Sequence, residues 1–426
     1  MSHLAPQFRF GTTTETHPYT AFAGALMLAG FAWMALLWIL PRLTHPKRWA
    51  LAAIALGLVF RAISFGDVSI YEDDWARYLW DGALVADGQN PYVHAPADIG
   101  ADHVLAPDSE AGQRTLARIN NPSLTTIYPP TAQAAFATAH IAAPFSLDGL
   151  RALWLLSDAI AMALMMGALA AWGRSSVWVV LYALNPLLIV TGFNSAHMDV
   201  LLTPFLMGAL WLAAPSARSL WRGLGTSYLL ALAVGVKLWP LILAPVLLRP
   251  WRDRFPLYLA LGTFTGALSL LLVWPMLGAL GANSGLEAYA TGWRNSAFLF
   301  RGLETVFGAT GGRVLVALAV CLLALALGLF TKHERDIPTD ALILTAALLF
   351  LSPTGYPWYG IWILALLPFR PLAGLALLSV LTPLYYVRFA LGEAGTYSIY
   401  TDILVPLQYG LPLLVLAFAT LKRARA

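Results

Sequence analysis

Long apolar runs alternate with short polar connections along almost the whole chain. Most of the runs are long enough to form helices that cross or nearly cross a bilayer. The pattern predicts an all-α polytopic membrane protein: one integral membrane domain, residues 1–426, with a bundle of about 11 to 13 transmembrane helices. The predicted spans are Tyr19–Pro41, Trp49–Gly66, Leu150–Trp172, Val177–Gly192, Met198–Ala214, Leu224–Val236, Leu238–Leu248, Pro256–Leu280, Val314–Phe330, Ala341–Leu351, Tyr359–Phe369, Leu372–Leu391 and Ile403–Leu421.

Lysine and arginine gather in a few short connections, and these set the predicted topology. Basic connections favour the cytoplasmic side. Successive spans alternate in direction, and all the basic connections fall on the cytoplasmic side only if Pro130–Pro144 does not cross the bilayer. An interfacial or re-entrant helix is therefore predicted there. Residues 67–148 and 281–312 become extracytoplasmic loops, on the same side as the N-terminus. The stretches placed in the cytoplasm include Arg42–Arg48, Arg249–Arg254, Lys332–Arg335 and Lys422–Arg425.

Composition supports the membrane class and excludes several others. Hydrophobic residues make up 59% of the chain and charged residues only 11%, and the net charge of +4 reflects basic membrane loops rather than a nucleic-acid surface. The single cysteine, Cys321, excludes a disulfide framework and a cysteine metal site. The N-terminus lacks the pattern of a cleaved signal peptide, so the first span is expected to remain as an anchor.

The segment Tyr71–Tyr92, YEDDWARYLWDGALVADGQNPY, carries five carboxylates directly after an apolar run. At helical spacing Asp74, Arg77, Tyr78 and Asp81 share a face, and Trp75, Leu79 and Trp80 can turn towards a membrane interface. Neighbouring carboxylates raise each other's pKa, so Asp73 or Asp74 is a candidate general base. The alternative is that one of these acids only caps the helix.

Other polar residues interrupt apolar sequence on the same predicted side of the membrane. A lysine or arginine inside an apolar span is expensive unless it meets an anion, protein or water. Arg61 is expected to face protein or the surface near the acidic segment. For the others the plainer alternatives are a solvated turn, a snorkelling lysine, or a turn in the aromatic belt. The groups are Arg61; Asn194, Ser195, His197 and Asp199 in FNSAHMD; Lys237; Arg294 and Arg301; and Tyr356 and Trp358 within Ser352–Trp358, SPTGYPW.

Several common catalytic signatures are missing from the sequence. There is no phosphate-binding G-x-x-x-x-G-K-[ST] loop, no dinucleotide fingerprint and no H-E-x-x-H zinc motif. A chemistry that needs no cofactor is therefore expected. A divalent cation at Asp73 and Asp74 is an alternative, since paired carboxylates suit hard cations, but it is not favoured.

The order of the polar blocks resembles the GT-C glycosyltransferases, and within them the bacterial mannosyltransferase-like branch. Asp73–Gly82 matches the family's Asp-Asp-x-x-Arg-Tyr-x-Trp-Asp-Gly pattern, and Tyr128–Pro130 matches its Tyr-Pro-Pro. Weaker matches are NNPSLTTIYPPTAQAAF, GFNSAHMDVLL, GVKLWPLILAPVLLR and SPTGYPWYGIWILALLP. The chain departs from the simplest family members in its extra N-terminal span, since in them the first span leads straight into the acidic loop.

The resemblance implies transfer of a mannose-like hexose from a polyprenyl-phosphate donor to a lipid or glycan hydroxyl, outside a bacterial plasma membrane. Asp73 or Asp74 would be the base, and the anomeric carbon would invert. On physical grounds Lys237, Arg294 and Arg77 are candidates to stabilise the departing phosphate. The residues expected to bind substrate are Arg77, Tyr78, Asp81, Tyr128, His197, Asp199, Lys237, Arg294, Arg301, Tyr356 and Trp358. Two other functions stay open: a transporter or flippase of a lipid-linked sugar, and a non-catalytic scaffold.

Overall fold

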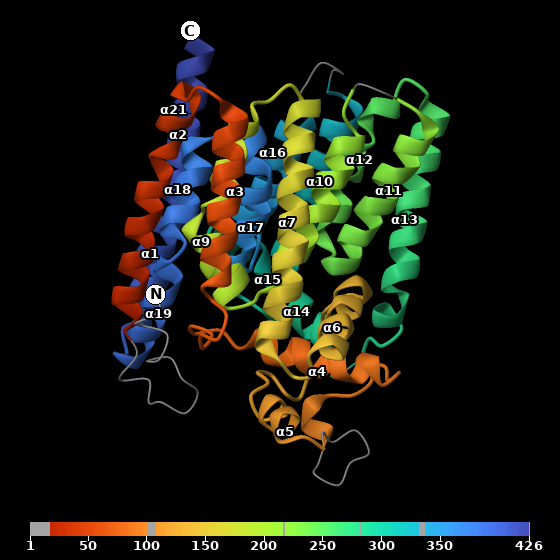
Figure 1. The fold of residues 1–426 in the computed structure, drawn as a ribbon, viewed down its shortest axis with the longest axis vertical. Helices are drawn as coiled ribbons and strands as arrows, with labels where there is room; N and C mark the ends of the chain where they lie inside the picture. The colour runs from red at the N-terminus through yellow and green to blue at the C-terminus, as the bar shows by residue number, and fades with distance from the viewer. Residues whose placement is uncertain (1–17, 100–107, 216–217, 282, 332–336, 426) are drawn as a thin grey trace.

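Helices form almost all of the structure, a computed structural model that describes residues 18–99, 108–215, 218–281, 283–331 and 337–425. Within these ranges the only β-type contact is an isolated parallel bridge between Asn295 and Thr354. The helices run side by side as a bundle, and the short helices between residues 74 and 142 gather at one end, called here the acidic-loop end (Figure 1). The α-helices are α1 Tyr19–Met34, α2 Leu36–Ile39, α3 Pro46–Ala62, α4 Asp74–Ala86, α5 Glu110–Leu116, α6 Pro130–Ala142, α7 Leu147–Ala171, α8 Val179–Ala183, α9 Pro186–Ile189, α10 Leu202–Leu212, α11 Leu220–Val236, α12 Ala244–Leu247, α13 Phe255–Leu277, α14 Gly285–Thr291, α15 Leu299–Leu329, α16 Ile337–Leu351, α17 Gly360–Leu366, α18 Ala373–Leu381, α19 Leu384–Glu393, α20 Tyr397–Ile399 and α21 Val405–Arg425.

Short tight or wide helical turns join or extend many of these helices. Two of them, Val190–Asn194 and Tyr400–Leu404, are π-helical. The others are 3₁₀ turns, at Leu40–Arg42, Pro96–Asp98, Ser176–Trp178, Met198–Leu201, Trp239–Leu243, Arg249–Trp251, Pro357–Tyr359 and Leu367–Phe369.

Six helical stretches in the described residues are long and apolar enough to cross a membrane, which is consistent with a polytopic membrane protein. A seventh results if Ser176–Ala183 and Pro186–Asn194, bent by 52° at their junction, count as one span. Several other predicted spans correspond to shorter apolar helices, so the total of 11 to 13 crossings stays a prediction. The six are Tyr19–Arg42, Leu147–Ala171, Phe255–Leu277, Leu299–Leu329, Ala373–Glu393 and Tyr397–Lys422.

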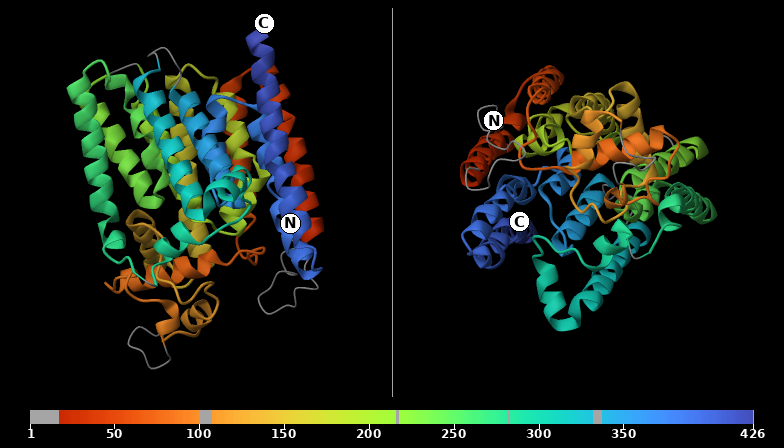
Figure 2. Two further views of the ribbon diagram at one scale, coloured as in Figure 1. Left: turned by 180° about the vertical axis from the view of Figure 1, so that it is seen from behind. Right: turned by 90° about the horizontal axis from the view of Figure 1, so that it is seen from below.

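The bundle has two sides that meet around the buried helix α17. On one side α7, α10, α11 and α13 pack in chain order. On the other, α1 packs against α18 and α19, and α21 packs against α18. Figure 2 shows α14 at the same end of the bundle as α4. The residues before Pro18 and the basic stretch Lys332–Arg335, which the sequence assigns to opposite sides of the membrane, lie outside the described residues.

The helix α6 is too short to cross a bilayer in a straight line. Its 13 residues span about 20 Å, against a hydrocarbon core of about 30 Å. It packs along α4, where Gly82 allows close approach: a Cβ there would lie 2.5 Å from the carbonyl oxygen of Phe136. This length fits the predicted interfacial or re-entrant helix.

The predicted orientation of the α4 tryptophans is wrong. Trp75, Leu79 and Trp80 are 8%, 1% and 1% exposed, so none of them faces a membrane interface. Helices α5 and α6 both pack on α4, and the Arg118 guanidinium lies 4.8 Å from the Trp75 ring centre. The apolar residues of α4 therefore form the core of the acidic-loop end, because the rest of the loop folds back over them.

Arg61 faces protein, as predicted for a cation in an apolar helix. It is fully buried, its Nε lies 2.7 Å from Oδ2 of Asp158, and a second nitrogen donates to the Ala183 carbonyl at 2.6 Å. Burying both charges is tolerable because each has a close partner. The pair ties α3 to α7.

Candidate functional site

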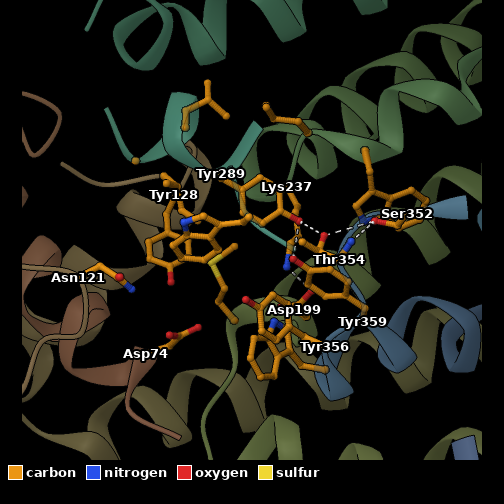
Figure 3. A pocket seen from close by; sticks show the side chains of 18 of the residues that line it. Asp74, Asn121, Tyr128, Asp199, Lys237, Tyr289, Ser352, Thr354, Tyr356 and Tyr359 are labelled. Carbon is orange, nitrogen blue, oxygen red and sulfur yellow. Dashed lines mark hydrogen bonds and ion pairs between the residues drawn. The ribbon is translucent and has the colours of Figure 1, made fainter. Parts of the chain in front are cut away.

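A cavity of about 710 Å³ is lined by residues at the acidic-loop end of the bundle. Its walls come from the α4 N-terminus, the loop before α6, α14, and the segment 352–362. Figure 3 shows Asp74 and Asn121 on one side of the cavity and Lys237, Tyr289 and Thr354 on the other. Most of the predicted site residues line it: Asp73, Asp74, Arg77, Tyr78, Tyr128, Asp199, Lys237, Tyr356 and Trp358.

The FNSAHMD segment holds the chain that leads into α4. Asn194 accepts a hydrogen bond of 2.7 Å from the Ile70 backbone, and Ser195 donates one of 3.2 Å to the Ile70 carbonyl. Asn194, Ser195, His197 and Asp199 are all at most 5% exposed. The solvated-turn alternative is therefore wrong: this segment is a buried anchor that places Glu72, Asp73 and Asp74 at the cavity.

A single side-chain amide links the two candidate bases. Asn120 Nδ2 donates to Oδ1 of Asp73 at 2.7 Å and to Oδ1 of Asp74 at 3.0 Å. Asp73 occupies the N-cap position of α4 but makes no side-chain capping bond. A role in capping alone therefore does not explain either acid, and the second oxygen of Asp74 is left for other contacts.

The surroundings disfavour full ionisation of the three neighbouring acids. Burial raises the pKa of Asp74 to about 6, opposed by the Asn120 hydrogen bond and reinforced by the charge of Asp73. Burial also raises the pKa of Asp73, against the effect of Asn120 and Arg118. The pKa of Glu72 is raised well above its usual range by burial and then by Asp74 and Asp73. A carboxyl with a pKa near 6 is suited to general-base work at neutral pH.

His197 lies behind the acids, between Asp74 and Glu72. Its Nδ1 is 3.7 Å from Asp74 Oδ2, its Nε2 is 3.8 Å from Glu72 Oε2, and its ring stacks on Trp358 at 3.7 Å. The residue is fully buried, and burial together with the Lys237 charge lowers its pKa well below the usual value. His197 does not line the cavity, contrary to its prediction as a substrate-binding residue; it is a buried neutral ring that supports the two carboxyl groups from behind.

Lys237 meets an anion inside the protein rather than snorkelling to an interface. Its Nζ lies 2.7 Å from Asp199 Oδ1 and 4.4 Å from the centre of the Tyr359 ring. Trp362 donates a second hydrogen bond, of 2.6 Å, to the same Asp199 oxygen. Helix α11 ends at Val236, and the extended backbone that follows places Lys237 in the cavity wall. The charge of Lys237 is balanced there by Asp199.

Arg77 and Asp81 form a buried pair one helical turn apart on α4. Arg77 Nε lies 2.9 Å from Asp81 Oδ1, and Gln133 on α6 donates to the other Asp81 oxygen at 3.0 Å. Asp81 is fully buried and does not line the cavity, contrary to its prediction as a substrate-binding residue. It instead fixes Arg77 and joins α4 to α6.

Hydroxyl and aromatic groups form the rest of the cavity wall, and among them Trp358 lies next to the acids because it stacks on His197. The Tyr289 hydroxyl lies 2.7 Å from the Thr354 hydroxyl and 2.8 Å from that of Tyr359 (Figure 3). Tyr356 stacks on Trp358 with ring centres 4.5 Å apart. The SPTGYPW segment thus lines the cavity rather than a membrane surface, and its rings and hydroxyls suit a sugar.

Arg294 and Arg301 do not line the cavity, so their prediction as substrate-binding residues is corrected. Arg294 pairs with Glu304 at 2.5 Å and Arg301 with Asp402 at 2.6 Å, and both arginine side chains are more than half exposed. The reason is the bridge at Asn295, which pairs with the 353–355 backbone on the cavity side. Neighbouring side chains of extended backbone point in opposite directions, so Arg294 faces outward.

Several cavity residues were not predicted from the sequence. Arg313 and Arg388 stand in apolar helices, the same signal that singled out Arg61 and Lys237, and would have been found by applying it throughout. Asn120 gives no local signal, because its partners lie 46 and 47 positions away. The unpredicted lining residues with polar side chains include Glu72, Asn120, Asn121, Tyr289, Arg313 and Arg388.

Neither the search for metal-binding groups nor the comparison with known proteins assigns a further role to the site. In the described residues no three His, Cys, Asp or Glu side chains are grouped so as to hold a metal ion, and the absence of a cofactor requirement stays a prediction. Comparisons of the chain with protein-family models, curated proteins and solved structures found no match. The GT-C resemblance therefore remains an expectation from the motifs.

Proposed function

We propose that the protein is a membrane glycosyltransferase that moves a hexose from a polyprenyl-phosphate donor to an acceptor hydroxyl. The observation that carries the proposal is one cavity in which a carboxyl with a pKa of about 6 stands with basic side chains and an aromatic wall. It lies at one end of an apolar helical bundle, from which a lipid-linked substrate would reach it. A bacterial plasma membrane, with the cavity on its outer face, is part of the proposal.

Asp74 is the proposed base. Its Oδ1 is held by Asn120, whereas Oδ2 has His197 as its neighbour at 3.7 Å. In the reaction the acceptor oxygen bonds to the anomeric carbon, its proton passes to Asp74, and the bond from that carbon to the phosphate oxygen breaks. The bonding electrons leave with the phosphate, and one displacement inverts the carbon. Asp73, bound to the same amide, is the positioning acid.

The aromatic wall and the cavity cations serve the two ends of the donor. Aromatic faces bind sugar C–H groups, so the partly exposed ring of Tyr356, which stacks on Trp358, provides a platform for the hexose. A phosphate that gains charge as it leaves is stabilised by fixed positive groups in a site of low dielectric. The acceptor, a lipid or a glycan, would approach from the acidic-loop end.

Product formation by the purified full-length protein in detergent micelles tests the proposal. Given a radiolabelled polyprenyl-phosphate mannose and a lipid extract as acceptor, the protein should form labelled product without any gradient and with inverted anomeric configuration. A transporter or flippase would yield no product in micelles. If lipid-linked donors carrying several different hexoses all gave no product, the proposed function would be contradicted.

A further inference from the structure

The basic side chains of the cavity differ in whether their charge is already balanced. Four line it: Arg77, Lys237, Arg313 and Arg388. Arg77 is bound to Asp81 and Lys237 to Asp199, at 2.9 and 2.7 Å. Among the residues that the structure describes, no carboxylate oxygen lies within 4.0 Å of the guanidinium group of Arg313 or Arg388. Glu72 acts on Arg388 only from beyond contact distance, so these two arginines are the cavity cations that have no carboxylate contact.

The two arginines are anchored to the same short segment. Arg313 on α15 donates to the Trp293 carbonyl at 3.0 Å, and Arg388 on α19 donates to Oδ1 of Asn295 at 2.7 Å. Positions 293 and 295 are two residues apart, so their Cα atoms are within about 7 Å. The segment itself is fixed, because Asn295 exchanges backbone hydrogen bonds with residues 353 and 355.

Aromatic rings hold both guanidinium groups in place. The Arg388 Cζ lies 4.1 Å from the centre of the Tyr385 ring, and the Arg313 Cζ lies 5.5 Å from that of Phe300. Each guanidinium carries five N–H donors and no acceptor. Arg388 uses one of these donors on Asn295, so most of its donors remain for a ligand. Such forks match the geometry of phosphate oxygens.

An apolar strip continues from Arg313 along α15. Val316 and Ala317 also line the cavity, and they stand three and four positions after Arg313, on the same helix face. Neighbouring residues of this helix, Val314 and Leu318, are 52% and 54% exposed, as expected for a surface in contact with lipid. The cavity thus combines a charged end with an apolar strip on a membrane-length helix.

We infer that Arg313 and Arg388 form the phosphate-binding site of the cavity, and that the site takes the phosphate-ester head of a lipid whose chain lies along Val316 and Ala317. The inference rests on the proposed function and deepens it. It moves the phosphate contact away from Lys237, which Asp199 already neutralises, and away from the surface residues Arg294 and Arg301.

Binding of a polyprenyl monophosphate to the full-length protein in detergent tests the site without any transfer reaction. Arg313→Gln and Arg388→Gln should each weaken binding by about tenfold or more, because each loses charge-assisted hydrogen bonds. Arg294→Gln and Arg301→Gln are the matched controls. They lose only exposed ion pairs and should stay within about twofold of the parent.

A neutral polyprenol of the same chain length distinguishes binding through the phosphate from binding through the lipid chain. It should bind weakly, and equally to the parent protein and both arginine variants. Arg313→Lys and Arg388→Lys keep the charge, so they should fold even if the glutamine variants do not, and should bind the phosphate more weakly than the parent. Inorganic phosphate should compete only poorly, since it lacks the chain.

Parent-like binding of the phosphate lipid by the Arg313 and Arg388 variants would overturn the inference. So would an equal loss for the neutral polyprenol, which would indicate damaged packing. Failure of this binding site and failure of the proposed enzyme activity give different results. A protein that binds the phosphate lipid through these arginines but forms no glycosylated product would keep the site and lose the enzyme.

Discussion

The side-chain amide of Asn120 donates a hydrogen bond of 3.0 Å to the Asp74 carboxyl, across 46 positions of sequence. A bond donated to a carboxylate favours its charged form and lowers its pKa. Asn120→Ala should therefore raise the pKa of Asp74 above about 6, and the acid limb of the pH profile of kcat/KM should move to higher pH.

Asn120→Asp is the sharper variant, because it replaces the donor by a third carboxyl beside two others. The acid limb should move further than in Asn120→Ala, since like charges raise the pKa of their neighbours. Ser109→Ala, which removes a helix cap elsewhere in the same loop, should leave the limb in place. An unchanged limb in both Asn120 variants would show that the amide does not control the base.

The parent protein should lose activity as the pH falls through the Asp74 pKa of about 6. A general base works only when deprotonated, so kcat/KM should fall about tenfold per pH unit below that value. A profile flat from pH 7 to pH 4.5 would argue against Asp74 as the base.

Protonation of Asp74 should stabilise the folded protein, although it abolishes the activity. The folded pKa of about 6 exceeds the usual value of 3.8, so the folded state binds the proton more tightly than the unfolded state. The unfavourable contribution is fully present above pH 6 and disappears as the pH falls towards 3.8; its upper limit is about 3 kcal/mol. Asp74→Asn should therefore raise the melting temperature at pH 7 and do so much less at pH 4.5, measured in detergent.

The Asp199–Lys237 pair should be needed as a pair. Lys237→Met leaves the Asp199 carboxylate buried without its counter-charge, at a cost of about 3 to 5 kcal/mol. Adding Asp199→Asn should restore most of the melting temperature, because the amide oxygen still accepts from Trp362. Equal melting temperatures for the single and double variants would show that the two charges are not coupled.

The predicted sidedness can be tested by cysteine labelling in intact cells. Cys321→Ser removes the only natural thiol. In that background a cysteine replacing the exposed Asp98 should react with a membrane-impermeant maleimide. A cysteine replacing the exposed Arg254, in a basic connection, should react only after lysis. The reverse pattern would place the cavity in the cytoplasm.

Local features of the sequence were enough to predict the class of fold and the acidic centre of the site. Apolar runs report membrane helices directly, and Asp73 and Asp74 stand next to each other in the chain. The polar segment around His197 was found because it interrupts apolar sequence, and the structure brings it against Asp74.

Long-range contacts decided what the sequence could not. Arg294 turns outward because Asn295 pairs with a segment nearly sixty positions away, and no local pattern predicts that bridge. Trp80 is buried rather than facing an interface because α6 folds back over α4. Helical periodicity describes which residues share a face, but it does not say what covers that face.

Initial rates of transfer for three single variants test the central claim most directly. With a purified lipid-linked donor in detergent, Asp74→Asn should reduce the rate by at least about a hundredfold, in line with the loss of a general base. Asp73→Asn should retain measurable turnover, and Asp98→Asn, an exposed acid of the same loop, should match the parent. Parent-like turnover by Asp74→Asn would contradict the account.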